Sequence, residues 1–104
     1  QNIEPNIPEI AKINARGIIV SSISENFDFV SRFFGPNCGV NEDPVTGSAH
    51  TTLTPFWAEK LGKTKLTAKQ ISKRGGVLEC ELKNDRVLIS GKCKTYLKGE
   101  IFIN

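Results

Sequence analysis

The residues best suited to chemistry lie together in the decapeptide NEDPVTGSAH, residues 41–50. Gly47 and Ser48 open a segment in which apolar residues recur at helical spacing. The first amides of a helix lack intrahelical partners and lie at the positive end of its dipole. Such a terminus can receive an anion, for example a substrate carboxylate, without a cationic side chain. Asp43, in the loop that leads to this helix, is then a candidate acid–base group.

The same decapeptide also has a purely structural interpretation. An Asp-Pro step followed by Thr-Gly-Ser is a common way to turn the chain and begin a helix. Ser48 is a weak nucleophile candidate, because no GxSxG motif surrounds it and His50 is poorly placed to be its base. We expect His50 to be a packed, hydrogen-bonded histidine. Spacing alone leaves both interpretations open, a helix cap or one wall of an active site.

The composition predicts one folded domain. The chain has 104 residues, of which 38% are hydrophobic and 24% charged, values typical of globular proteins. No apolar run is long enough to cross a bilayer, and residues 1–10 do not resemble a signal peptide. These features predict a cytoplasmic protein that does not bind membranes.

The cysteines indicate neither a disulfide framework nor a metal site. Cys38, Cys80 and Cys93 are an odd number without regular spacing, and the chain has one histidine. We therefore expect free thiols that are buried or half-buried, and no bound metal.

The charge is unevenly distributed along the chain. Residues 1–57 carry three basic and six acidic side chains, whereas residues 58–104 carry eleven basic and five acidic ones. A basic half can bind nucleic acid, but here no aromatic residues accompany the lysines for base stacking. A solvated basic face is the preferred interpretation, and no nucleic-acid partner is predicted.

The predicted elements make up an α+β architecture, in which a curled mixed or antiparallel sheet wraps around one helix. Helices are expected at 8–14, 47–61 and 67–72, and strands at 17–23, 28–34, 77–82, 86–90 and 94–103, the last with a break at Gly99 as an alternative.

Helix 47–61 is the main helix. Its apolar residues cover more than one stripe, which predicts that other elements enclose it. Gly62 is expected to end it, and Pro55 is expected to kink it. Strand 17–23 is expected to be buried on both faces, Thr67 is expected to cap the short helix, and residues 84–85 are expected to form a hairpin turn.

The stretch from Arg32 to Pro36, together with that from Gly39 to His50, resembles the signature of the phenazine-biosynthesis (PhzF-like) isomerase family. The similarity continues through Leu53, 55–63, 70–76 and 85–91, and covers nearly the whole chain from about Asn6 onward. Proline at position 55 also occurs in the family's helix.

The resemblance implies a fold related to diaminopimelate epimerase. Such proteins have two similar lobes, each a curled sheet around a central helix, with the active site in the cleft between them. Residues 1–104 correspond to the second, C-terminal lobe. The first lobe is expected to be absent, and the second to lack its first strands.

The resemblance also assigns roles to individual residues. Asp43 matches the family's cleft aspartate, which assists proton transfer or positions the substrate, and Ser48 completes the catalytic set. Thr46, Gly47 and Ser48 match groups that hold the substrate carboxylate or its neighbours. The principal acid–base group of the family is a glutamate of the first lobe, which no residue here matches. Pro44 stands nearest to the catalytic cysteine of the epimerases, so a two-thiol racemase is not predicted.

The leading hypothesis is therefore the C-terminal lobe of a cofactor-independent isomerase. It would move a proton within a small carboxylated metabolite, shifting a double bond or a stereocentre, with the first lobe as its partner. The isolated chain is expected to be inactive, and its exposed cleft face could support a homodimer. The alternative is a non-catalytic binding or assembly module that retains the fold.

Overall fold

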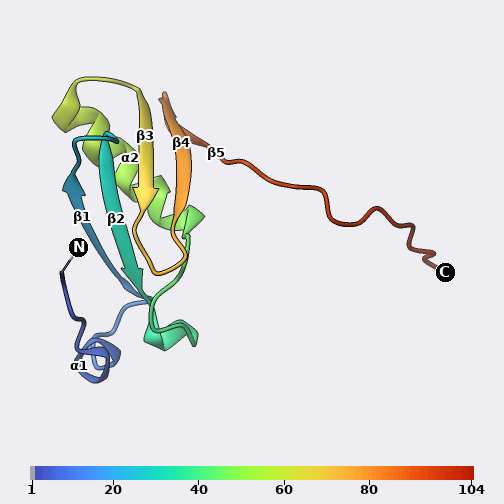
Figure 1. The fold of residues 1–104 in the computed structure, drawn as a ribbon, viewed down its shortest axis with the longest axis horizontal. Coiled ribbons are helices and arrows are strands. Elements are labelled where there is room, and N and C mark those ends of the chain that lie inside the picture. The colour runs from blue at the N-terminus through green and yellow to red at the C-terminus, as the bar shows by residue number, and fades with distance from the viewer. Residues whose placement is uncertain (1) are drawn as a thin grey trace.

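In the computed structural model, which describes residues 2–104, five strands form one mixed sheet and one long helix covers a face of it (Figure 1). The α+β class is therefore confirmed. The elements in chain order are α1 (Ile7–Ala11), β1 (Ile18–Ile23), β2 (Phe29–Phe34), the 3₁₀ turn η1 (Pro36–Cys38), α2 (Gly47–Leu61), β3 (Lys65–Gln70), β4 (Gly76–Lys83) and β5 (Arg86–Ser90).

The strands lie in the order β1-β2-β3-β4-β5, and β2 and β3 form the one parallel pair of this sheet. Phe29 is opposite Ala68, and Ser31 is opposite Gln70. Parallel neighbours need a crossover connection, and α2 provides it. A crossover helix begins at the edge where both parallel strands end. The start of α2 therefore lies close to the end of β3, and this topology builds the site described below.

The core lies between α2 and the sheet. Phe29 stacks on Trp57 with ring centroids 5.8 Å apart and on His50 at 5.9 Å. The buried apolar residues of the cluster are Phe29, Phe33, Ala49, Leu53, Trp57, Ala58, Leu66, Ala68, Leu78 and Cys80. Helix α2 runs unbroken through Pro55 and ends at Gly62, whose φ of 64° is left-handed, as predicted for a helix-ending glycine.

Two expectations about enclosure are wrong for the described chain. Five strands cover one side of α2 and leave Phe56 on its other side 48% exposed. Strand β1 is not buried on both faces, because none of its six residues is fully buried and its last residue, Ile23, is 64% exposed.

The predicted helix over 67–72 is also wrong, because these residues belong largely to β3. Leu66, Ala68 and Gln70 are buried while Lys65 and Thr67 are exposed, the alternation of a strand with one face on the core. Pairing with β2 and β4 on both sides outweighs the weak helical propensity of the segment.

The strand predicted at 94–103 is absent, and residues 91–104 extend away from the sheet without a pairing strand (Figure 1). The hairpin between β4 and β5 is confirmed, with Asn84 at a φ of 55°. Cys80 is buried, but Cys38 and Cys93 are exposed, contrary to expectation. Among residues 2–104, no helix is long and apolar enough to span a membrane.

Candidate functional site

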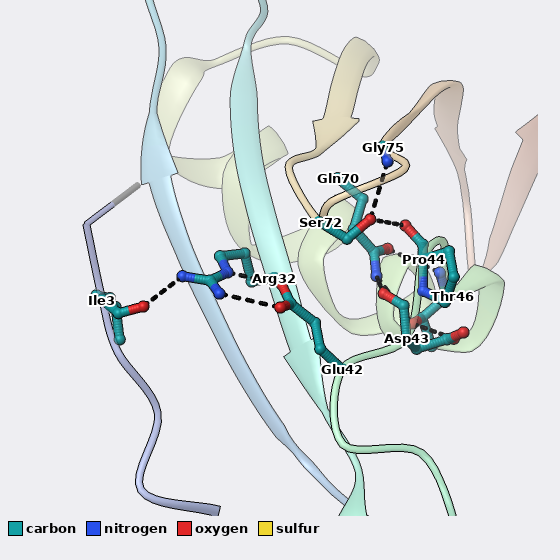
Figure 2. A network of polar contacts seen from close by, with 9 residues as sticks. All are labelled: Ile3, Arg32, Glu42, Asp43, Pro44, Thr46, Gln70, Ser72 and Gly75. Carbon is teal, nitrogen blue, oxygen red and sulfur yellow. Dashed lines mark hydrogen bonds and ion pairs between the residues drawn. The ribbon is translucent and has the colours of Figure 1, made fainter.

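The half-buried Asp43 is directed toward the start of α2. Its Oδ2 accepts a hydrogen bond of 2.5 Å from the Thr46 hydroxyl, and Figure 2 shows the two side chains meeting at the tip of the helix. Its backbone N–H donates to the Phe33 carbonyl at 3.0 Å, which ties the loop to the end of β2. The carboxylate therefore has a defined position beside the helix terminus.

Gln70, at the end of β3, binds the loop that contains Asp43 from the core side of the sheet. It is fully buried, and its Oε1 accepts from the Thr46 backbone N–H at 2.7 Å. Its Nε2 donates to the Asp43 carbonyl at 2.9 Å and to the Thr46 hydroxyl oxygen at 3.0 Å (Figure 2). A chain of contacts therefore runs from the core through Gln70 and Thr46 to the Asp43 carboxylate.

Ser72 supports the same loop from the turn after β3. Its hydroxyl donates to the Pro44 carbonyl at 2.7 Å and accepts from the Gly75 N–H at 3.0 Å. Close packing reinforces the arrangement, because a Cβ placed on Gly76 would lie 2.3 Å from a methyl of Val45. The loop before α2 is thus fixed by β3 and by the segment that follows it.

The first turn of α2 has no side-chain cap. Thr46 is the N-cap residue, but its hydroxyl is engaged by Asp43 and Gln70 and does not cap the helix. Gly47 and Ser48 are exposed, and a Cβ on Gly47 would meet nothing within 4 Å. The first amides are therefore available to solvent or to a ligand.

Arg16 adds a positive charge to this helix start that sequence reasoning missed. Its Nη2 donates to the Ser48 hydroxyl at 2.5 Å across a separation of 32 residues. The segment that carries it is tied to η1, because Cys38 Sγ donates to the Arg16 carbonyl at 3.3 Å and Asn37 Nδ2 donates to the Ala15 carbonyl at 3.1 Å. No local pattern signals this contact, since the fold alone brings the two segments together.

The two neighbouring acids of the decapeptide have different environments. Glu42 forms a bidentate ion pair with Arg32, at 2.7 and 3.0 Å, and Arg32 also donates to the Ile3 carbonyl at 2.7 Å (Figure 2). The hydrogen bond that Arg32 donates to the Glu42 carboxylate raises the pKa of Arg32. Glu42 is thus an anchor of the loop, whereas Asp43 faces the helix tip.

His50 is a packed residue, as expected. It is fully buried, and its Nδ1 donates to the Thr46 carbonyl at 2.7 Å. Burial lowers the pKa of His50, which favours the neutral ring, and its Nε2 has no partner among the described residues. His50 therefore supports the N-cap residue from within the core.

The structure brings Asp43, Thr46, Gly47 and Ser48 to one corner, but this corner is open. A cavity of about 710 Å³ lies elsewhere, formed by the loop 23–28 and neighbouring strands, and neither Asp43 nor Ser48 lines it. Within residues 2–104, no three His, Cys, Asp or Glu side chains are grouped to hold a metal ion. The arrangement can bind an anion at the helix start and place a carboxylate beside it.

A mixed sheet whose crossover helix starts at this corner matches one protein family in sequence and in structure. The family model PhzC-PhzF, described as phenazine biosynthesis-like protein, matches residues 1–99. The chain belongs to this family, and its fold is the diaminopimelate-epimerase-like fold.

Several relatives are similar over nearly the whole chain. An uncharacterized isomerase, PA2770, of Pseudomonas aeruginosa is 52% identical over 97% of this chain and 39% of its own length. A second, BH0283, of Halalkalibacterium halodurans is 49% identical over 99% of this chain and 40% of its own length. Phenazine biosynthesis-like domain-containing protein 2 of mouse is 45% identical over 96% of this chain and 37% of its own length.

Two solved structures have the same fold over this chain. A putative phenazine biosynthesis PhzC/PhzF protein from Clostridium difficile has a TM-score of 0.85 and 47% identity. A PhzF-family protein from Enterococcus faecalis has a TM-score of 0.87 and 44% identity. Each match covers 98% of this chain and 40% of the solved chain. The chain thus spans about two fifths of the length of these relatives.

Proposed function

We propose that this chain is the C-terminal lobe of a cofactor-independent isomerase that moves a proton within a small carboxylated metabolite. One observation carries the proposal: the Asp43 carboxylate is turned toward a helix start that has no side-chain cap and faces open space. The relatives named as isomerases support the reaction class. These relatives are longer than this chain, which supports a second lobe that covers the exposed helix start and Asp43.

In this proposal the helix start binds the substrate carboxylate. The amides of Gly47 and Ser48 donate to it, and the Arg16 guanidinium adds a charge-assisted hydrogen bond from the other side of Ser48. Because these donors are fixed by the fold before substrate arrives, they also stabilise negative charge that develops as the proton leaves carbon.

Asp43 assists the proton transfer. The principal base is a glutamate of the first lobe, which takes the proton from one carbon and returns it to another carbon on the same face; inversion of a stereocentre would instead require Asp43 to deliver a proton from the opposite face. One C–H bond breaks and one forms, so the substrate undergoes no net oxidation and the step needs no redox cofactor. The hydroxyls of Thr46 and Ser48 complete the hydrogen-bonding network around Asp43 and the substrate.

Carboxylate binding can be tested on the 104-residue chain itself. We expect titration with benzoate to shift the amide resonances of Gly47 and Ser48, with a dissociation constant on the order of millimolar because one wall of the cleft is absent. The Arg16→Gln variant should bind about three- to tenfold more weakly, since it loses a charged donor. Lys60→Gln, in the last turn of α2 at the opposite end of the helix, removes the same charge as a matched control and should bind like the wild type.

Two outcomes would count against the proposed site. If benzoate moved no amide resonance at Gly47 or Ser48, the helix start would not be a carboxylate site. If the 104-residue chain alone catalysed the isomerisation, the requirement for a second lobe would be removed. A complete protein that binds the carboxylate without turnover would favour the non-catalytic module.

A further inference from the structure

The buried amide of Gln70 has one orientation that satisfies its neighbours. Its Oε1 faces the Thr46 backbone N–H at 2.7 Å, and its Nε2 faces the Asp43 backbone carbonyl at 2.9 Å. A backbone N–H can only donate and a carbonyl can only accept, so an amide turned by 180° would place like groups against each other. Because Gln70 is fully buried, solvent would not replace the two lost hydrogen bonds.

This orientation fixes the direction of the next hydrogen bond. Gln70 Nε2 also donates to the Thr46 hydroxyl oxygen at 3.0 Å, so that oxygen accepts. The hydroxyl has a single hydrogen, which is then directed to Asp43 Oδ2 at 2.5 Å. The donors therefore run from Gln70 through Thr46 to Asp43, and each hydrogen bond polarises the next one (Figure 2).

The two carboxylate oxygens of Asp43 are consequently not equivalent. Within residues 2–104, Oδ2 is the one that accepts a hydrogen bond, and its donor cannot be reversed while Gln70 keeps its orientation. In a protonated carboxyl group the carbonyl oxygen is the better acceptor and the hydroxyl oxygen is the donor. A proton carried by Asp43 is therefore favoured on Oδ1.

The polar character of Gln70 serves this loop alone. The two preceding core-facing residues of β3, Leu66 and Ala68, are apolar, and burying an amide at the next such position is costly unless it is hydrogen-bonded. All three hydrogen bonds of the Gln70 amide go to the loop that carries Asp43.

We propose that Gln70 is a positioning residue for Asp43. Acting through Thr46, it reserves Oδ2 as an acceptor and leaves Oδ1 as the oxygen that exchanges a proton with the substrate. When Asp43 acts as the acid, the O–H bond at Oδ1 breaks, the proton goes to a substrate carbon, and the electron pair stays on the carboxylate. The reverse step brings the proton to Oδ1. The inference rests on the role proposed above for Asp43.

An asparagine at this position makes the two oxygens distinguishable. In the Asp43→Asn variant of the 104-residue chain, the side-chain oxygen should accept from Thr46, and the NH2 group should take the place of Oδ1. Measured by NMR, both hydrogens of this NH2 group should exchange with solvent about as fast as those of the exposed Asn84, and at least about tenfold faster than those of the buried Gln70.

Benzoate binding measures what this position presents to a ligand. Asp43→Asn should tighten binding, because a donor replaces a negative charge beside the anion. The gain should be at least about threefold larger with Thr46 or Thr46→Ser than with Thr46→Val, since only a hydroxyl holds the amide oxygen away from the helix start and turns the NH2 group to the ligand. A general loosening of the loop affects both residues at position 43 alike and cancels in this comparison.

Gln70→Met tests the first hydrogen bond of the series. Without an N–H facing it, the Thr46 hydroxyl can either donate or accept, so about half of the amides of Asp43→Asn should turn and the gain should fall by about twofold. Lys65→Met introduces the same side chain at an exposed position of β3 and should leave the gain unchanged.

The inference would be overturned if the NH2 group of Asp43→Asn were as protected as that of Gln70. Equal gains with Thr46→Val and Thr46→Ser, or a full gain with Gln70→Met, would overturn it as well. The exchange measurement needs no ligand, so it supports or overturns the inference even if benzoate does not bind, a result that would count against the proposed carboxylate site. If Trp57 fluorescence showed that Gln70→Met does not fold, the two Thr46 variants would decide the question.

Discussion

The contact between Gln70 and the loop before α2 gives a quantitative prediction for Gln70→Met. Methionine has nearly the same length and volume, so the change removes hydrogen bonds and creates little cavity. Three bonds are lost, to the Thr46 N–H, the Asp43 carbonyl and the Thr46 hydroxyl. At about 1 kcal/mol each, the free energy of unfolding should fall by about 3 kcal/mol. That is a large fraction of the roughly 5–15 kcal/mol of a domain of this size.

Urea unfolding of the 104-residue chain, followed by Trp57 fluorescence, measures this loss. With a typical slope of about 1–3 kcal/mol per molar urea, the midpoint should fall by about 1–3 M. Lys65→Met is the matched control, because it introduces the same side chain at an exposed position of the same strand, and its change should stay within about 0.5 kcal/mol. A loss below about 1 kcal/mol for Gln70→Met would refute the claim that this amide holds the loop in place.

Two further predictions concern Asp43 and His50. In a complete two-lobed protein, Asp43→Asn should lower turnover by about 100-fold or more with little loss of stability, with turnover measured as incorporation of solvent deuterium into substrate. Asp85→Asn, in the β4–β5 turn, is the control. Near-normal turnover of the Asp43→Asn variant would remove Asp43 from the site. Burial lowers the pKa of His50 in the folded state, so the unfolded chain takes up a proton below about pH 6.5 that the folded chain does not. The free energy of unfolding should therefore fall with decreasing pH from about 6.5, by at most about 1.4 kcal/mol per pH unit, and His50→Asn should remove this component; an unchanged pH dependence in that variant would contradict the assignment.

Much of the architecture follows from local sequence. The end of α2 is set by Gly62, and the β4–β5 hairpin by the Asn84–Asp85 turn, because these residue types tolerate the left-handed backbone conformation found at Gly62 and Asn84. The helix predicted for residues 67–72 is wrong, because the helical propensity of this segment is weak and the neighbouring strands β2 and β4 decide its conformation.

The environment of the two adjacent acids could not be predicted. Glu42 pairs with Arg32, ten residues earlier, and the sequence contains several other basic residues that could have served. Gln70 lies 24 residues after Thr46, and nothing in its own neighbourhood indicates a buried amide. Contacts of this kind depend on strand register, which is a property of the whole sheet.

By itself, the sequence determined the helix start and the acid ahead of it, because helix termini and turns are built from neighbouring residues. Only the tertiary structure decided that Arg16 reaches Ser48, that Gln70 fixes the loop, and that residues 91–104 pair with no strand among residues 2–104. Each of these depends on which distant segments the crossover from β2 to β3 brings together, and on which sheet edges it leaves open.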